Sequence, residues 1–327
     1  MPPKVLLMTN LPFSGAALDR LLVAAGDDVV RVEPDDDAGI RAALETVEVA
    51  VLAGDLDARH LGAPRLKWVH CDHAGLTRSA RPEVFERGLI VTGSAGRSGP
   101  ALAEHVMLFA LLLTGGFLQF HEAQRRGEWL RTPELSALRA LAGRTMGIVG
   151  MGHTGTALAR RAKAFEMQVL GYRRRDAEPP EGVDEMFATE RGDTIDAMLP
   201  RCEILALVVN LSDATSGLIG ARQLALLPRG AIVINLSRGE VIDQDALVAA
   251  LKSEQLGGAG LDVTTPEPLP PGHPLWSTPN VLITPHFTPA LPDKSDRSLE
   301  IILDNFARYR AGTAMRNRLT PDDVYRS

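Results

Sequence analysis

Three glycines near the middle of the chain are spaced as in loops that bind the phosphates of a dinucleotide. Gly150, Gly152 and Gly155 follow a short apolar run over residues 145–149. A segment with helical periodicity and then a second apolar run, over residues 168–172, come after them. In such loops the first glycine allows a tight turn, the second a close approach to a pyrophosphate, and the third close helix packing. The strand, glycine turn, helix and strand predict a dinucleotide-binding unit with the pyrophosphate at the helix N-terminus.

The end of the second of these strands favours NADP(H) over NAD(H). NAD-specific units carry an Asp or Glu about 20 residues beyond the glycines to bind the ribose 2′-hydroxyl. Here that position is Arg173, with Arg174 and Arg175 after it, and no carboxylate lies between Gln168 and Asp176. Guanidinium groups bind phosphate through forked, charge-assisted hydrogen bonds, so these arginines suit a 2′-phosphate. NAD(H) remains the alternative if the arginines form only a solvated strand end.

Polar motifs stand where three later predicted strands end. They are Ser-Arg-Gly around Arg238, Glu-Pro at Glu267 and Pro-His at His286. Taken singly, an arginine caps turns, a glutamate before proline lies on the surface, and a histidine packs in a core. At three strand ends of one parallel sheet they indicate a site, because ligands bind at the carboxyl edge. Ala74 and Gly75, after an earlier strand, have backbone N–H groups that suit an anion, although taken alone this segment is better interpreted as a plain loop.

The segments that carry these motifs resemble the D-isomer-specific 2-hydroxyacid dehydrogenases. The resemblance runs in order from about residue 65 to about residue 310, through ALAEHV, RGEW, GMGHTGTALARRAKAFEMQV, INLSRGEVIDQDAL, GLDVTTPEPLP and ITPHFT. The first 60 residues fit the family by fold alone. The resemblance places Arg238, Glu267 and His286 on the family's catalytic positions.

The chemistry that the resemblance implies needs these three residue types. Reduction of a 2-oxoacid delivers a hydride to the carbonyl carbon and a proton to the emerging alkoxide. His286 suits the proton donor, and a carboxylate beside it, Glu267, stabilises the charged imidazolium. Arg238 supplies a permanent forked donor for the carboxylate and carbonyl oxygen of the substrate.

The resemblance also implies contacts outside these three residues. Ala74 and Gly75 would hold the substrate carboxylate through backbone N–H groups, and Asp262 would accept from the nicotinamide carboxamide. Two residues depart from the family's pattern, Thr154 in the glycine loop and His73 before Ala74. The remaining expected cofactor contacts are Gly150, Gly152, His153, Thr154, Gly155, Leu211 and Thr215.

The fold class implied is α/β, with two doubly wound parallel-sheet domains. We expect a flavodoxin-like substrate domain over residues 1–112 and a Rossmann cofactor domain inserted over residues 113–289. An amphipathic helix and tail, residues 290–327, should return to the first domain. Six strands are expected in the cofactor domain, over residues 145–149, 168–172, 204–210, 231–235, 259–263 and 281–284.

A very apolar helix over residues 100–113 should be buried nearly all round, between domains or subunits. In the resembling family it helps to form a two-fold dimer, so a homodimer is expected. Glu104 and His105 are unusual within it, and we interpret both as structural rather than catalytic.

Composition excludes several classes of protein. With 45% hydrophobic and 23% charged residues, the 327-residue chain suits a soluble globular protein of two domains. A net charge of −6 argues against nucleic acid as a partner, and two cysteines without CxxC spacing against a disulfide framework or metal site. The longest apolar run, residues 106–113, is far short of the ~18 residues that span a bilayer. A cytoplasmic protein is expected.

The sequence therefore predicts an NAD(P)-dependent 2-hydroxyacid dehydrogenase that acts on a small 2-oxoacid such as glyoxylate or hydroxypyruvate. Two alternatives stay open. One is an oxidoreductase like phosphite dehydrogenase, which shares this architecture. The other is a dinucleotide-binding module like the family's transcriptional corepressors, without physiological turnover.

Overall fold

A computed structural model describes residues 3–131, 138–287 and 291–326. The chain divides into two compact units, Met1–Arg97 with Ala290–Ser327, and Ser98–Pro289. The first crossing between them lies before the long apolar helix α5 (Gly99–Thr114), whereas the sequence analysis drew its boundary near the end of that helix, at residue 112. The difference arises because α5 packs on α8 (His153–Ala164) of the second unit.

The first unit is built on a five-stranded parallel sheet in the order β2-β1-β3-β4-β5. This is the flavodoxin-like order, and three of its strands are buried along their whole length, as expected for continuous apolar runs covered on both faces. The strands are β1 (Val5–Met8), β2 (Val29–Val32), β3 (Val49–Leu52), β4 (Trp68–Cys71) and β5 (Ile90–Gly93). The helices are α1 (Ala16–Ala25), α2 (Asp37–Leu44), α3 (Ala58–Gly62), α4 (Pro82–Glu86) and α12 (Lys294–Ala311).

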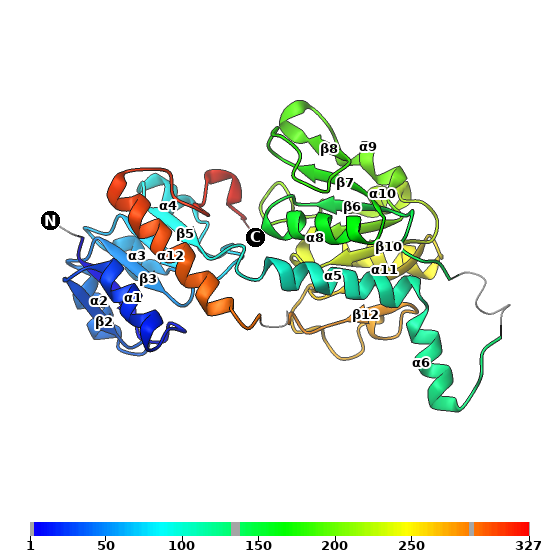
Figure 1. Cartoon of the computed structure of the whole chain (residues 1–327), viewed down its shortest axis with the longest axis horizontal. Coiled ribbons are helices and arrows are strands. Elements are labelled where there is room, and N and C mark those ends of the chain that lie inside the picture. Colours follow the sequence, from blue (N-terminus) through cyan, green and yellow to red (C-terminus); the bar gives the residue numbers. More distant parts are fainter. Residues whose placement is uncertain (1–2, 132–137, 288–290, 327) are drawn as a thin grey trace. The chain divides into compact units, whose positions relative to one another are not determined.

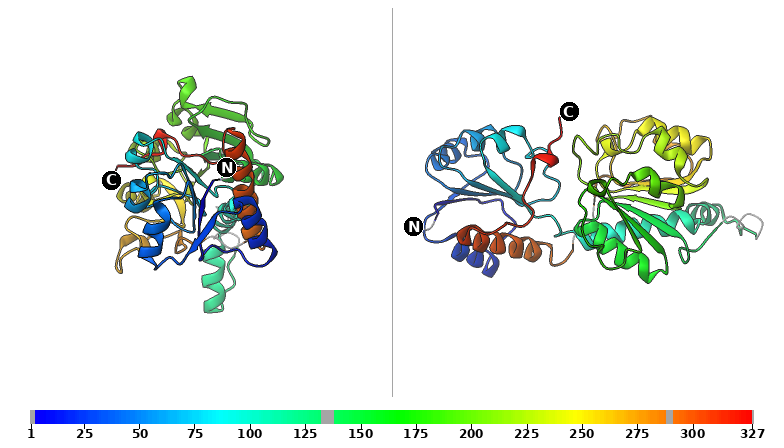
Figure 2. Two further views of the ribbon diagram at one scale, coloured as in Figure 1. Left: turned by 90° about the vertical axis from the view of Figure 1, so that its left-hand side faces the viewer. Right: turned by 90° about the horizontal axis from the view of Figure 1, so that it is seen from above.

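The C-terminal helix α12 completes the first unit. Figure 2 shows α12, in orange, beside α1, in blue, on one face of the sheet. Its apolar stripe buries Leu299, Ile302 and Phe306 against β1, β3 and Trp68, whose ring centroid lies 4.9 Å from that of Phe306. The stripe at helical spacing in the sequence is therefore the face that covers this sheet.

The second unit is built on a seven-stranded parallel sheet in the order β12-β11-β10-β9-β6-β7-β8. From β6 the chain adds β7 and β8 on one side of the sheet, and then β9 to β12 on the other side, which is the Rossmann order. The predicted fold class is confirmed. The strands are β6 (Thr145–Val149), β7 (Gln168–Arg173), β8 (Glu185–Ala188), β9 (Ile204–Leu207), β10 (Ala231–Asn235), β11 (Leu256–Leu261) and β12 (Val281–Ile283).

The prediction of six strands in this sheet was wrong, because it missed the edge strand β8. Only four residues form β8, inside a polar stretch without a clear alternation, and they pair with β7 alone. Met186 and Phe187 are buried there. The strand exists because β7 supplies a template, which a local pattern does not reveal.

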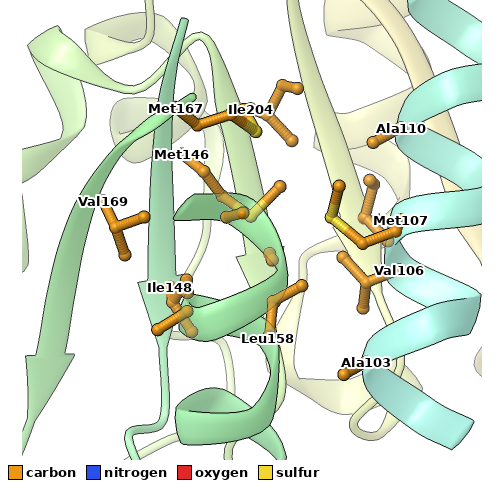
Figure 3. Close-up of a cluster of buried hydrophobic side chains, with 14 of the residues drawn as sticks. Ala103, Val106, Met107, Ala110, Met146, Ile148, Leu158, Met167, Val169 and Ile204 are labelled. Carbon is orange, nitrogen blue, oxygen red and sulfur yellow. The ribbon is translucent and has the colours of Figure 1, made fainter. Parts of the chain in front are cut away.

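Helices cover both faces of the second sheet (Figures 1 and 2). Figure 3 shows Val106 and Met107 of α5 facing Leu158 of α8 and the strand residue Met146, within one apolar core. The other helices are α6 (Phe117–Arg126), which projects from the unit in Figure 1, α9 (Ile195–Met198), α10 (Ala221–Leu226) and α11 (Gln244–Lys252). Short 3₁₀ turns lie at Thr189–Arg191, Leu199–Arg201, Gly239–Val241 and Pro274–Trp276, and at Pro321–Asp323 in the first unit.

Within one chain helix α5 is buried on one face, so its expected burial against a second subunit stays a prediction. One face covers the core, but Leu108 and Leu111 on the other are 49% and 44% exposed. Glu104 lies on the exposed face and pairs with Arg161 at 2.7 Å. An apolar helix with a single covered face leaves large hydrophobic side chains open to a partner.

Candidate active site

The glycine loop follows β6, the strand at which the sheet order reverses. Gly150 has φ +101°, and a Cβ there would lie 2.8 Å from the backbone of Val208. A Cβ on Gly155 would collide with the carbonyl of Gly150, whereas at Gly152 nothing lies within 4 Å. Two of the glycines thus permit tight backbone packing, and the third faces open space. The N-cap residue of α8 is Gly152, which has no side chain to cap the helix, so the first N–H groups of α8 suit the pyrophosphate of a bound dinucleotide.

The other expected cofactor contacts lie around this loop. His153 is exposed and Thr154 half-buried in the first turn of α8, and Leu211 is buried after β9. Thr215 has a structural task in the turn after β9. Its hydroxyl accepts from the backbone N–H of Ser212 at 2.8 Å and donates to a carbonyl at 2.7 Å.

The arginines at the end of β7 differ in what they do. Arg173 donates from Nε to the carbonyl of Arg175 at 2.9 Å and from Nη2 to that of Glu178 at 3.0 Å. It also donates to the carbonyl of Ala177. The guanidinium of Arg173 therefore braces the loop after β7, while the side chain of Arg174 is exposed.

Arg238 is placed by a clamp at the end of β10. The side chain of Asn235 donates to the carbonyl of Arg238 at 2.9 Å and accepts from both the backbone N–H and the hydroxyl of Ser237. Arg238 is half-buried, and its Nη1 lies 2.6 Å from the carbonyl of Ser237. Asn235 thus fixes the turn that presents the guanidinium at the carboxyl edge of the sheet.

Gly239 joins this turn to the loop after β11. A Cβ at Gly239 would collide with the carbonyl of Thr264 and the hydroxyl of Thr265. Gln244, at the start of α11, bonds both backbone groups of Thr265, at 2.8 Å and 3.0 Å. Only glycine allows this approach, so the loops that carry Arg238 and Glu267 pack directly on each other.

His286 and Glu267 form a hydrogen-bonded pair. His286 Nδ1 lies 2.8 Å from Glu267 Oε2, and Glu267 Oε1 accepts from the backbone N–H of Thr264 at 3.1 Å. A carboxylate only accepts, so Nδ1 carries the hydrogen. The other ring nitrogen, Nε2, makes no hydrogen bond with any residue that the structure describes. The pair is therefore set to transfer a proton at Nε2.

Asp262 holds the backbone on which His286 stands. Its carbonyl accepts from the N–H of His286 at 2.8 Å, and its Oδ1 accepts from the N–H of Phe287 at 2.9 Å. His286 has φ +51°, a left-handed conformation that is uncommon outside glycine and needs such support. The other carboxylate oxygen, Oδ2, accepts no hydrogen bond within the described part of the chain.

Ala74 and Gly75 lie in the first unit, in the loop after β4. The carbonyl of His73 accepts from the N–H of Ser94 at 3.0 Å, and the His73 ring Nδ1 lies 3.1 Å from the carbonyl of Ala74. C=O and N–H groups point in opposite directions across a trans peptide, so these two bonds also set the directions of the Ala74 and Gly75 N–H groups. Gly75 has φ +76°.

A buried polar network lies beneath this loop. The ring of His70 bonds Thr92 Oγ1 at 2.9 Å and Ser94 Oγ at 3.1 Å, and Ser94 donates to Asp72 at 2.7 Å. Arg97 pairs with the same carboxylate at 3.0 Å. Burial lowers the pKa of His70 to about 4, so the ring is neutral at physiological pH.

The structure thus brings Arg238, Glu267, His286 and Asp262 to one edge of one sheet, where β10, β11 and β12 end side by side. Sequence reasoning missed Asn235 and Gln244, which have no signal beyond their places at a strand end and a helix start. The described residues contain no group of three or more His, Cys, Asp or Glu placed to hold a metal ion. In the same part of the chain no single helix is long and apolar enough to cross a membrane, and α5 with α6 passes that test only as a pair bent by 62°.

A Rossmann sheet with a glycine loop at its reversal point, and an Arg, Glu and His set at the same carboxyl edge, define a dinucleotide-dependent oxidoreductase. The family model described as "D-isomer specific 2-hydroxyacid dehydrogenase, NAD binding domain" matches residues 107–288. The chain belongs to the D-isomer specific 2-hydroxyacid dehydrogenase family.

Individual proteins agree with this assignment. A glyoxylate reductase from Korarchaeum cryptofilum is 34% identical over 284 residues, covering 84% of this chain and 83% of that protein. A family member from Xanthobacter autotrophicus, solved with NADPH and MES, is 29% identical with a TM-score of 0.81 over 98% of this chain and 99% of that one. A probable 2-hydroxyacid dehydrogenase from Rhizobium etli, solved with NADP, HEPES and L(+)-tartaric acid, is 26% identical with a TM-score of 0.79 and the same coverage.

Proposed function

We propose that this protein is an NADP(H)-dependent reductase of a small 2-oxoacid such as glyoxylate or hydroxypyruvate, or the dehydrogenase of the matching D-2-hydroxyacid. The observation that carries the proposal is the 2.8 Å pair of His286 Nδ1 and Glu267 Oε2. It keeps one hydrogen on Nδ1, so that the charged imidazolium gives its second proton from Nε2 to the alkoxide formed at the carbonyl. The bound reduced nicotinamide supplies the hydride.

The same proposal assigns the remaining groups of the site. Arg238 binds the carboxylate and carbonyl oxygen of the substrate, and Ala74 and Gly75 bind that carboxylate through their backbone N–H groups. Asp262 accepts from the nicotinamide carboxamide through Oδ2. The first unit, with the tail over residues 290–327, is then the substrate domain, and the second unit is the cofactor domain.

The preference for NADP(H) rests on the loop after β7. Three arginines and no carboxylate end that strand, and Arg173 holds the loop in shape through three backbone carbonyls. Arg174, exposed beside it, binds the 2′-phosphate. Two structurally similar proteins contain NADPH or NADP, which supports this choice.

The assembly proposed is a homodimer formed through α5 and α6. The large apolar side chains left open there are those of Leu108, Leu111, Phe117 and Phe120, each between 39% and 49% exposed. A second copy of the same surface would cover them by two-fold symmetry. The proposed location is the cytoplasm, where the two free thiols stay reduced.

A kinetic screen tests the proposed function. Purified protein is assayed with NADPH and with NADH against a panel of 2-oxoacids, and the substrate with the highest kcat/KM is then used for His286→Ala. General acid catalysis contributes about 10²–10⁴-fold, so kcat should fall by that factor while the Kd of NADPH stays within about twofold. A wild type that binds NADPH but reduces no 2-oxoacid would favour the corepressor-like alternative. If the variant keeps more than about a tenth of wild-type kcat, His286 is not the proton donor.

A further inference from the structure

A hydrogen-bonded chain links the apolar helix α5 to the edge of the sheet that carries the site. His105 of α5 is 4% exposed, and its Nε2 lies 3.2 Å from Thr284 Oγ1, just after β12. Thr284 Oγ1 in turn donates to Asp262 Oδ1 at 2.5 Å. The expectation that His105 packs passively in α5 leaves this chain unexplained.

The direction of each hydrogen bond in the chain is determined. The one hydrogen of the Thr284 hydroxyl goes to the carboxylate, so this hydroxyl can only accept from His105. Nε2 of His105 is therefore the protonated nitrogen. Burial lowers the pKa of His105, which keeps the ring neutral and leaves Nδ1 as a bare acceptor.

The bare acceptor is energetically unfavourable. Nδ1 of His105 is buried and has no hydrogen-bond partner among the described residues, and the ring lies 4.6 Å from that of Phe109. An apolar side chain at this position in α5 would avoid that cost. Stability alone therefore does not explain why a histidine stands here. The N–H that the ring donates to Thr284 explains it.

The chain determines how Asp262 presents its two oxygens. Oδ1 accepts from Thr284 and from the N–H of Phe287 at 2.9 Å, so it is fully committed. Two bonds at one oxygen fix the rotation of the carboxylate and direct Oδ2 away from both donors. Oδ2 is the oxygen assigned above to the carboxamide.

We infer that His105 is a positioning residue for cofactor binding, which acts through Thr284 to hold Asp262 in the orientation that receives the nicotinamide carboxamide. The inference rests on the proposed function, since it assumes that Asp262 meets the nicotinamide. It predicts an effect confined to the nicotinamide half of the cofactor. Neither His105 nor Thr284 needs to touch cofactor or substrate.

The test compares NADPH with 2′-phospho-ADP-ribose, which has the same adenine half but lacks nicotinamide. Thr284→Val should raise the Kd of NADPH about tenfold, because it loses both hydrogen bonds of the chain, and His105→Leu about fivefold, because it loses one. The Kd of 2′-phospho-ADP-ribose should stay within about twofold in both. The double variant should bind NADPH no worse than Thr284→Val alone, since His105 acts only through Thr284.

Three further variants separate positioning from folding. His105→Gln and Thr284→Ser keep the N–H and the hydroxyl and should restore most of the NADPH affinity. Thr278→Val is the matched control. Thr278 is a buried threonine near β12, and its hydroxyl donates at 2.9 Å to the carbonyl of Pro274 rather than to a residue of the His105–Thr284–Asp262 chain, so both Kd values should be unchanged. His105→Leu should unfold at a temperature equal to or above that of the wild type, because it removes the unpaired Nδ1.

Several results would overturn the inference. Equal weakening of NADPH and 2′-phospho-ADP-ribose would show a general loss of structure, and additive effects in the double variant would show that His105 does not act through Thr284. Unchanged affinity for NADPH in Thr284→Val would show that the hydrogen-bonded chain takes no part in cofactor binding. A wild type that binds neither NADPH nor NADH would instead overturn the proposed function itself.

Discussion

The buried histidine of the first unit makes stability depend on pH in a way that can be calculated. His70 is wholly buried in β4, and burial lowers its pKa from 6.5 to about 4. Its surroundings explain why protonation is unfavourable. Trp68 donates to Thr92 Oγ1, Thr92 donates to His70 Nδ1, His70 Nε2 donates to Ser94, and Ser94 donates to Asp72, so every hydrogen is already placed.

A second proton on His70 would reverse this chain. Nδ1–H would face a threonine hydroxyl that already accepts from Trp68, and the hydroxyl hydrogen would need a new acceptor. The unfolded chain has no such constraint and binds the proton with a pKa near 6.5. The unfolded state thus binds more protons between about pH 4 and 6.5, so stability is lost as the pH falls through this range.

The pKa difference sets the size of the effect. The contribution is close to zero at pH 7.5, about 2 kcal/mol at pH 5, and about 3 kcal/mol once the pH is below 4. In His70→Gln, which has no titrating ring, this part of the pH dependence should disappear. The free energy of unfolding should then fall by about 2 kcal/mol less between pH 7.5 and pH 5 than in the wild type.

Tryptophan fluorescence during urea unfolding measures the stability of the first unit, which contains His70. Trp68 is fully buried in the first unit, whereas Trp129 and Trp276 are 94% and 56% exposed, so the emission shift on unfolding reports mainly on Trp68. His121→Gln, the same substitution at an exposed site of the second unit, should keep the wild-type pH dependence. If His70→Gln and the wild type lose the same free energy between pH 7.5 and pH 5, the reasoning about His70 is refuted.

Four further predictions address the site and the assembly. Glu267→Gln should lower kcat, because a neutral amide is a weaker acceptor than the carboxylate for the N–H at His286 Nδ1; an unchanged kcat would exclude that role. Gly239→Ala should cost about 1–3 kcal/mol of stability and lower kcat, since its methyl group meets Thr264; wild-type kcat would contradict the packing of the two loops. Arg173→Asp should lower the ratio of kcat/KM for NADPH to that for NADH, and a wild type that prefers NADH would refute the NADP(H) assignment. Light scattering should give twice the chain mass of 35.2 kDa, and the single mass at micromolar concentration would refute the dimer.

Some features that the sequence analysis missed depend on how groups meet in space rather than on residue types. Strand β8 has too few residues for a pattern and forms because β7 offers free pairing groups. Nothing in the run Arg173 to Arg175 shows that the first guanidinium turns back onto three carbonyls of its own loop. The exposed face of α5 is equally invisible, because the sequence shows that the helix is apolar but not which neighbours cover it.

What the sequence determined by itself was local or repetitive. Continuous apolar runs located most strands and a 3.6-residue period most helices. Glycine spacing and strand-end polar residues located the dinucleotide loop and Arg238, Glu267 and His286, because these depend on neighbours within a few residues. Only the tertiary structure decided the 2.8 Å contact of His286 with Glu267, and the chain from His105 through Thr284 to Asp262. These join residues up to 179 positions apart, and a hydrogen bond requires a distance and direction that only the packed elements supply.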